Sequence, residues 1–192
     1  MMRRRLLLAA SALLMAVAAW QLAAGGWIHA KAWLARGLID AAWARASAGE
    51  AHPRPWPWAD TWPVARLQVP RLGVERTVLS GSSGRVMAFG PGHVAGTPAP
   101  GEPGNTVLTG HRDTHFRFLR HLHPGDIVRV DRPDGLTQVY EVTDTAVVRE
   151  TDTQILEGQG GDTVLVLLTC WPFDALRPGG SMRYVVTAMS RQ

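Results

Sequence analysis

Cysteine is nearly absent from this sequence, because Cys170 is the only one among 192 residues. An internal disulfide is therefore impossible, and the redox compartment stays open. Net charge is also small outside the N-terminus, since Arg3, Arg4 and Arg5 supply three of the four formal positive charges. A nucleic-acid reader carries a basic stripe on its folded part, and no such stripe occurs here. Internal repeats are missing too, and the length suits one domain with a short appendage.

Charged residues are also missing from a run of 19 residues, Leu6 to Ala24, which follows the three arginines. About 20 apolar residues are needed to cross a bilayer as a helix. Basic residues stay on the cytoplasmic side, so residues 1–24 are expected to be a membrane anchor that places the rest outside. The alternative is a signal peptide cleaved after the small residues Val17, Ala18 and Ala19.

Residues 25–60 are expected to connect this anchor to the body. Apolar positions in 25–48 recur at helical spacing, which predicts an amphipathic helix that lies on the membrane surface or packs against the body. Residues 52–63 contain four prolines, which exclude a helix. We interpret this segment as a linker whose tryptophans, Trp56, Trp58 and Trp62, dock on the body; a lid over the site is the alternative.

The remaining residues, 61–192, are rich in short β-branched runs separated by turns, consistent with the 20 glycines and 13 prolines of the chain. About eight short strands with few helices predict an all-β fold, a small closed or nearly closed barrel. The expected strands are 64–69, 74–79, 105–109, 126–131, 137–143, 146–149, 163–170 and 181–188.

The last two strands carry the first candidate site residues. Cys170 ends one strand, and Arg183 lies near the start of the next, after a loop rich in proline and glycine. If the strands form a hairpin, a thiol and a permanent cation lie together at one rim. His111 ends the strand 105–109 in a similar way, and would reach the same rim if that strand runs parallel to the strand of Cys170.

Cysteine, histidine and arginine at one rim have a coherent chemistry. A thiolate is a nucleophile that nearby positive charge favours. An imidazole can protonate a leaving amine, and arginine, which never loses its proton, can stabilise an oxyanion. Taken singly, each residue has a plainer interpretation: Cys170 as a small buried hydrophobe, His111 as a turn residue, and Arg183 as a solvated edge residue.

Three motifs resemble the signature blocks of the sortases, membrane-anchored cysteine transpeptidases built on an eight-stranded β-barrel. They are VLTGHR at 107–112, LLTC at 167–170 and RYVV at 183–186. The resemblance covers roughly residues 55–190 and is greatest to the single-copy proteobacterial sortases. It implies that His111, Cys170 and Arg183 form the catalytic triad, and that Thr169 and Trp171 contact the substrate. The alternatives for these two are strand packing for Thr169 and filling of the barrel end for Trp171.

The resemblance also implies the reaction and the partners. Cys170 would cleave an LPXTG-like C-terminal sorting motif of a membrane-held protein between Thr and Gly, and an unidentified amine would accept the acyl group from the thioacyl enzyme. The enzyme would sit in the inner membrane with a monomeric catalytic body in the periplasm. We expect no cofactor and no metal ion. The acidic residues that could suggest calcium, Glu141, Asp144, Glu150 and Asp152, show no ligand geometry in the sequence.

Three other functions compete with this interpretation. A zinc site at His111, His115 and His121 or His123 lacks the HExxH pattern of helical zinc proteases. A cysteine protease of the papain type places Cys before His, whereas His111 comes first here, although water could still resolve a thioacyl enzyme. A membrane-tethered barrel that only binds peptides is the third. His93 is expected to structure its loop, and Asp113 to be a solvated turn residue.

Overall fold

A computed structural model describes residues 2–154, 162–175 and 179–191 of the chain. The elements are α1 (Met2–Ser47), β1 (Pro63–Val69), η1 (Pro70–Leu72), β2 (Val74–Ser80), α2 (Gly84–Met87), β3 (Gly92–His93), β4 (Gly104–Thr109), η2 (Arg117–His121), β5 (Ile127–Asp131), β6 (Thr137–Arg149), β7 (Thr163–Trp171) and β8 (Met182–Ser190).

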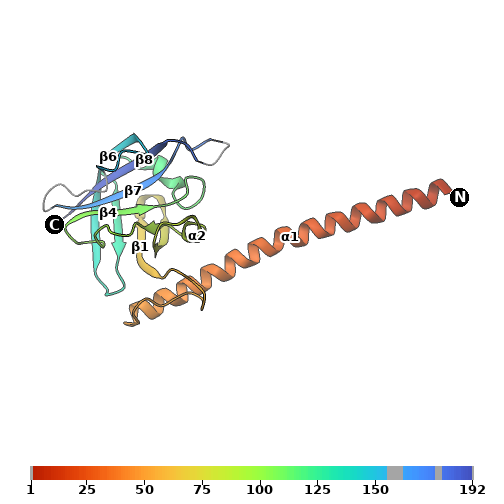
Figure 1. Cartoon of the computed structure of the whole chain (residues 1–192), viewed down its shortest axis with the longest axis horizontal. Coiled ribbons are helices and arrows are strands. Elements are labelled where there is room, and N and C mark those ends of the chain that lie inside the picture. The colour runs from red at the N-terminus through yellow and green to blue at the C-terminus, as the bar shows by residue number, and fades with distance from the viewer. Residues whose placement is uncertain (1, 155–161, 176–178, 192) are drawn as a thin grey trace. The chain divides into compact units, whose positions relative to one another are not determined.

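The eight strands close into a barrel in the order β1-β2-β3-β4-β7-β8-β6-β5. The pairs β2–β3 and β4–β7 are parallel, and the other pairs are antiparallel. Figure 1 shows β4, β7, β8 and β6 as neighbours on one side of the barrel. The expected all-β, sortase-like eight-stranded barrel is confirmed.

Strand alternation separates two apolar faces in the part of the sheet that contains β4, β7 and β8. Leu165 and Leu167 are fully buried and belong to the main core inside the barrel, as does Val186. Their neighbours along the strands point the other way, and Val107, Val166 and Val185 form a second buried cluster. Side chains alternate between faces with period two, so the two clusters lie on opposite sides of the sheet.

One local expectation is wrong. The sequence predicts separate strands at 137–143 and 146–149, but β6 is one strand whose register with β8 shifts between Val142 and Asp144. Such a bulge absorbs an extra residue without ending the strand. The strand β3 was not expected, because two residues are too short for periodicity. Its Gly92 lies so close to β2 that a Cβ would be 2.1 Å from the carbonyl oxygen of Gly81.

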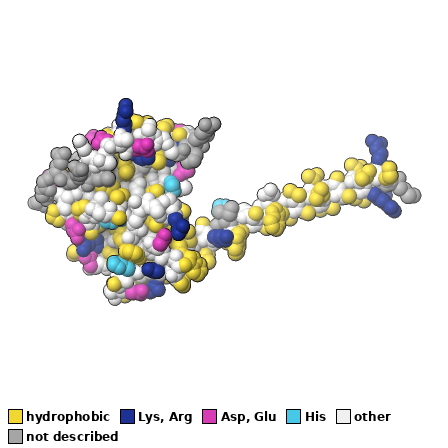
Figure 2. All heavy atoms as spheres, in the orientation of Figure 1, with side chains coloured by type: hydrophobic (Ala, Val, Ile, Leu, Met, Phe, Trp, Pro, Cys, Tyr) yellow, Lys and Arg dark blue, Asp and Glu magenta, His cyan; other side chains and the backbone are white. Residues whose placement is uncertain are grey.

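The chain consists of two compact units, Met1–Gly37 and Leu38–Gln192. The described residues of the first unit belong to α1, which runs without a break through the expected anchor and the expected amphipathic segment. Length and composition make α1 a candidate membrane span. Figure 2 shows its surface as largely hydrophobic, with basic side chains near the N-terminal end.

The second unit begins with the last turns of α1, which pack on the barrel. Ile39 is buried in a cluster with Leu79 and Val86, and Asp40 accepts a hydrogen bond from Arg66 at 3.3 Å. This part of the helix therefore follows the alternative in which it packs on the body.

The linker that follows contains no helix between residues 50 and 62, as expected. Trp56 packs on the cluster of Ile39 and lies edge-on to Phe89 at 5.0 Å, and Trp62 lies 4.4 Å from the His52 ring. Trp58 is 81% exposed, so the expectation that all three tryptophans dock on the body is wrong for Trp58.

Candidate active site

Cys170 and Arg183 are directly opposite each other in the antiparallel pair of β7 and β8. Residues opposite each other in such a pair project from the same face, with Cβ atoms about 4.5–5.5 Å apart. Both side chains are partly exposed. The predicted hairpin is therefore confirmed, and it places Cys170 and Arg183 in opposing positions at the end where the two strands are joined.

His111 follows β4, which runs parallel to β7 as expected. Thr109 is level with Leu168, and the backbone N–H of Gly110 donates to the Leu168 carbonyl at 3.2 Å. Continuing this register by two residues places exposed His111 level with Cys170. The three candidate residues thus come from three adjacent strands, in the order β4, β7 and β8.

Gly110 fixes the position at which the chain leaves β4 for His111. Its carbonyl oxygen accepts a hydrogen bond from the hydroxyl of Thr169 at 2.7 Å. A Cβ at Gly110 would lie 2.9 Å from the buried ring of Phe116, so only glycine fits without a shift. The backbone N–H of Phe116 in turn donates to the His111 carbonyl at 2.9 Å. His111 is therefore attached to a rigid segment.

Arg112, the residue after His111, holds the loop between β7 and β8. It is only 7% exposed, and its guanidinium donates to the carbonyl oxygens of Ala175 at 3.0 Å and Gly179 at 3.4 Å. A buried cation is costly unless its donors are satisfied, so these contacts stabilise Arg112 between Ala175 and Gly179. The segment that carries His111 is thereby connected to the loop that joins Cys170 to Arg183.

Thr169 and Trp171 lie on the barrel side of β7, opposite to the face of Cys170. Thr169 is 2% exposed, and its hydroxyl is bonded to Gly110. The partly buried ring of Trp171 packs on the main core and stacks on Tyr184 with 5.7 Å between centroids. These contacts agree with the alternatives of strand packing and filling of the barrel end; direct contact with substrate stays a prediction for both residues.

The face of Cys170 also carries an apolar cluster. Val107, Val166 and Val185 form its buried centre, and partly buried residues pack around them: Val94, Val148, Val164 and Leu168. Leu168 precedes Cys170 by two residues on the same face.

Arg183 has an acidic neighbour that the sequence did not indicate. Its Nη2 donates to the carboxylate of Glu150 at 2.7 Å. Glu150 follows β6, and the pairing of β6 with β8 brings the two residues together across 33 positions of the chain. The sequence did not predict three residues as parts of the site: Gly110, Arg112 and Glu150. For Gly110 and Arg112 the available signal was their position beside His111.

His93 structures its loop, as expected. Its Nε2 lies 3.0 Å from the Pro98 carbonyl oxygen and 3.2 Å from the Thr97 hydroxyl. Asp113 is exposed, which is consistent with a turn residue.

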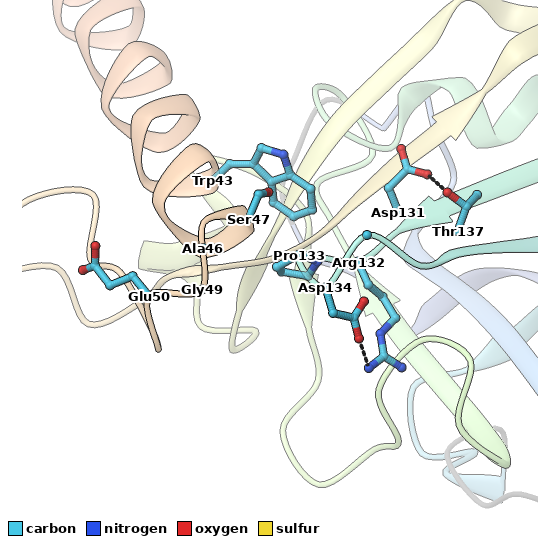
Figure 3. A pocket seen from close by; sticks show the side chains of 11 residues that line it. Trp43, Ala46, Ser47, Gly49, Glu50, Asp131, Arg132, Pro133, Asp134 and Thr137 are labelled. Carbon is cyan, nitrogen blue, oxygen red and sulfur yellow. Dashed lines mark hydrogen bonds and ion pairs between the residues drawn. The ribbon is translucent and has the colours of Figure 1, made fainter.

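A pocket lies elsewhere on the second unit, between the last turns of α1 and the turn that joins β5 to β6 (Figure 3). Its acidic groups are already paired: Asp131 accepts from the Thr137 hydroxyl and Asp134 from Arg132, both at 2.7 Å, and Glu50 forms an ion pair with Arg45 at 3.6 Å. None of the three predicted catalytic residues lines it.

Asp126 and Tyr140, which lie outside the predicted triad, have shifted pKa values. Hydrogen bonds from Arg71 lower the pKa of the Asp126 carboxyl, burial opposes them, and the backbone N–H of His123 lowers it further. Burial raises the pKa of the Tyr140 hydroxyl, although Gly101 donates a hydrogen bond to its oxygen at 2.9 Å. Asp126 precedes β5 and Tyr140 lies in β6, so neither belongs to the predicted triad.

Comparison with known proteins shows the family to which the chain is related. Residues 67–191 match the family model described as the sortase domain. Sortase D of Bacillus subtilis (strain 168) is 33% identical over 120 residues, 62% of this chain and 60% of that protein. The match thus spans less than two thirds of the curated relative.

Solved structures agree with this assignment. The crystal structure of sortase C-1 from Actinomyces oris is 33% identical, with a TM-score of 0.62 over 68% of this chain and 75% of that one. A sortase D5 transpeptidase of Clostridium perfringens has a TM-score of 0.61 over 78% of this chain and 87% of that one; at 24% identity, this likeness shows the fold alone.

A closed eight-stranded barrel with a cysteine and an arginine at one rim defines the structural class. The chain belongs to the sortase family.

Proposed function

We propose that this protein is a membrane-anchored cysteine transpeptidase that cleaves an LPXTG-like sorting motif near the C-terminus of a partner protein and transfers the acyl part to an amine. The observation that carries the proposal is the row of His111, Cys170 and Arg183 on three adjacent strands. Family membership supports it, as does the similarity to sortase D of Bacillus subtilis and sortase C-1 of Actinomyces oris.

In the first step, the thiolate of Cys170 attacks the carbonyl carbon of the threonine in the motif. The oxyanion of the tetrahedral intermediate lies near Arg183, which stabilises its charge. The C–N bond then breaks, and the imidazolium of His111 gives its proton to the departing amine of glycine. The product is a thioester on Cys170 and a free C-terminal fragment.

In the second step, an amine attacks the thioester while His111 takes a proton from it. An amide forms, and the sulfur leaves as the thiolate, so Cys170 is regenerated. Water in place of the amine gives a carboxylic acid, which is the hydrolytic alternative. In this proposal Thr169 and Trp171 support the end of β7 from inside the barrel.

The membrane part of the proposal is that the apolar N-terminal half of α1 spans the inner membrane and leaves the barrel in the periplasm. The apolar composition of α1 and the arginines at its start support this orientation. Confinement to one bilayer would raise the effective concentration of a membrane-held substrate. In spheroplasts with an intact inner membrane, added protease should degrade the barrel; protection of the barrel would contradict this orientation. Placement in the single-copy proteobacterial subgroup, with one dedicated substrate, is part of the same proposal.

The test of the activity uses the full chain in detergent micelles with LPXTG-like peptides, and intact-mass measurement with and without an amine. An acyl adduct on the wild type that is absent from Cys170→Ala and is released as an amide would establish transpeptidation. Release as the free acid alone would indicate a protease. We expect Arg183→Ala to lower the acylation rate by roughly 10²- to 10³-fold, as for removal of other oxyanion donors. A folded wild type without any adduct would leave the peptide-binding barrel as the better proposal.

A further inference from the structure

Glu150 extends the row of site residues to a fourth strand. The pairing of β6 with β8 ends at Arg149 opposite Met182, and the backbone N–H of Glu150 then donates to the Ser181 carbonyl at 2.8 Å. Val148 is directly opposite Arg183. Alternation therefore places Glu150 on the face of Arg183, as a diagonal neighbour within reach of a long side chain. β6, β8, β7 and β4 lie next to one another (Figure 1).

Three acceptors hold the guanidinium of Arg183. Nη2 donates to the Glu150 carboxylate at 2.7 Å, while Nη1 donates to the carbonyls of Gly180 at 2.6 Å and Met182 at 3.0 Å. A guanidinium has five N–H donors in a rigid plane. Among the described residues, these contacts leave two donors for other oxygen atoms, so the pairing fixes the plane without using all of its hydrogen-bonding capacity.

We propose that Glu150 is a positioning residue: its carboxylate holds the Arg183 guanidinium in one orientation on the strand next to that of Cys170, so that the two remaining donors are already oriented when an acyl oxygen arrives. The inference rests on the proposed transpeptidase function. Arginine has many rotamers, so ordering its side chain costs conformational entropy. If the side chain is ordered before the reaction, this entropic cost no longer adds to the barrier of acylation.

Folding stability should depend little on this pair. The side chains of Arg183 and Glu150 are 24% and 48% exposed, and ion pairs of this kind contribute little to stability. Removal of the carboxylate should therefore change the rate of acylation more than the melting temperature.

The test compares Glu150→Ala and Glu150→Asp with Glu141→Ala as a matched control. Glu141 is on β6, the strand that Glu150 follows, and pairs with Arg191 at 3.5 Å, away from Cys170. The full chain in detergent micelles is used for the acylation kinetics. We expect Glu150→Ala to lower kcat by about tenfold with KM nearly unchanged, because an interaction made in the transition state is weakened. Glu150→Asp should recover part of the rate, and Glu141→Ala should match the wild type.

A double-mutant cycle separates positioning from a general structural effect. In an Arg183→Ala background, removal of Glu150 should cause no further loss of rate, because its effect passes through Arg183. A wild-type rate in Glu150→Ala, an equal loss in Glu141→Ala, or an additional loss in the double variant would overturn the proposal.

A second measurement does not depend on activity. The side-chain Nε–H signal of Arg183, assigned with Arg183→Lys, should report an ordered group by ¹⁵N relaxation in the wild type and a mobile one in Glu150→Ala. If the wild type forms no acyl adduct, the proposed function fails, and the relaxation data still decide on Glu150. Increased mobility supports the positioning role, and unchanged mobility refutes it.

Discussion

Thr169 donates its buried hydroxyl to the carbonyl oxygen of Gly110 at 2.7 Å, and thereby connects the residue before Cys170 to the residue before His111. The two residues are 59 positions apart in the chain. The bond crosses from β7 to the end of β4, where the backbone ladder between these strands stops. A single side chain therefore helps to set the relative position of the proposed nucleophile and the proposed acid.

Replacement of Thr169 by valine should destabilise the barrel and slow acylation. The shape is nearly conserved, but the hydrogen bond is lost, which costs about 1 kcal/mol or somewhat more when a buried partner is left behind. Thermal unfolding and the acylation rate measure the two effects. Thr169→Ser keeps the hydroxyl and serves as the control; if valine and serine variants acylate at the same rate, the bond to Gly110 has no role in the reaction.

Gly110→Ala should displace the segment of His111. The new Cβ would be 2.9 Å from Cγ of Phe116, a fully buried ring that cannot withdraw. Overpacking of this kind costs roughly 1–3 kcal/mol. Gly84→Ala is the matched control, because a Cβ at Gly84 meets nothing within 4 Å in helix α2. Equal melting temperatures for the two variants would contradict the steric argument.

Trp171→Ala should act mainly on stability. The ring stacks on Tyr184 and lies edge-on to Phe173 at 5.7 Å, on the barrel side of β7. Loss of a packed aromatic side chain costs about 3 kcal/mol in a core, and somewhat less where the ring is partly exposed. Urea unfolding measures this cost. The prediction of direct substrate contact would instead be supported by a large rise in KM with little change in stability.

The stability of the barrel should fall with acid through Asp126. Its pKa is lowered in the folded state by the hydrogen bonds from Arg71, so the carboxylate form stabilises the fold. This contribution is complete above the unfolded pKa of about 3.9 and is lost as the pH falls through the lower, folded value. Asp126→Asn should cost roughly 1–2 kcal/mol near neutral pH.

The difference between the wild type and Asp126→Asn should shrink as the pH falls below about 4. Unfolding measured by tryptophan fluorescence between pH 7 and pH 3 checks this behaviour. A difference that stays constant over that range would mean that the carboxylate charge contributes nothing to the fold.

Sequence patterns and family motifs predicted the strand pair around Cys170, the barrel and the three candidate catalytic residues. Local information suffices for these, because apolar runs, turn residues and short motifs are each contained in a few neighbouring positions. Alternation of side chains along β7 also predicts that Thr169 and Trp171 lie on the face opposite to Cys170. The family resemblance had instead suggested that both contact the substrate.

Only the tertiary structure decided how distant segments meet. The parallel pairing of β4 with β7 places His111 level with Cys170, and pairing partners cannot be read from either strand alone. The ion pair of Glu150 with Arg183 depends on one continuous β6, whose bulge between Val142 and Asp144 looked like a break in the sequence. The strand β3 also depends on the tertiary structure, because a strand of two residues exists only where neighbouring strands, here β2 and β4, pair with it. Its Gly92 approaches Gly81 more closely than any side chain would allow.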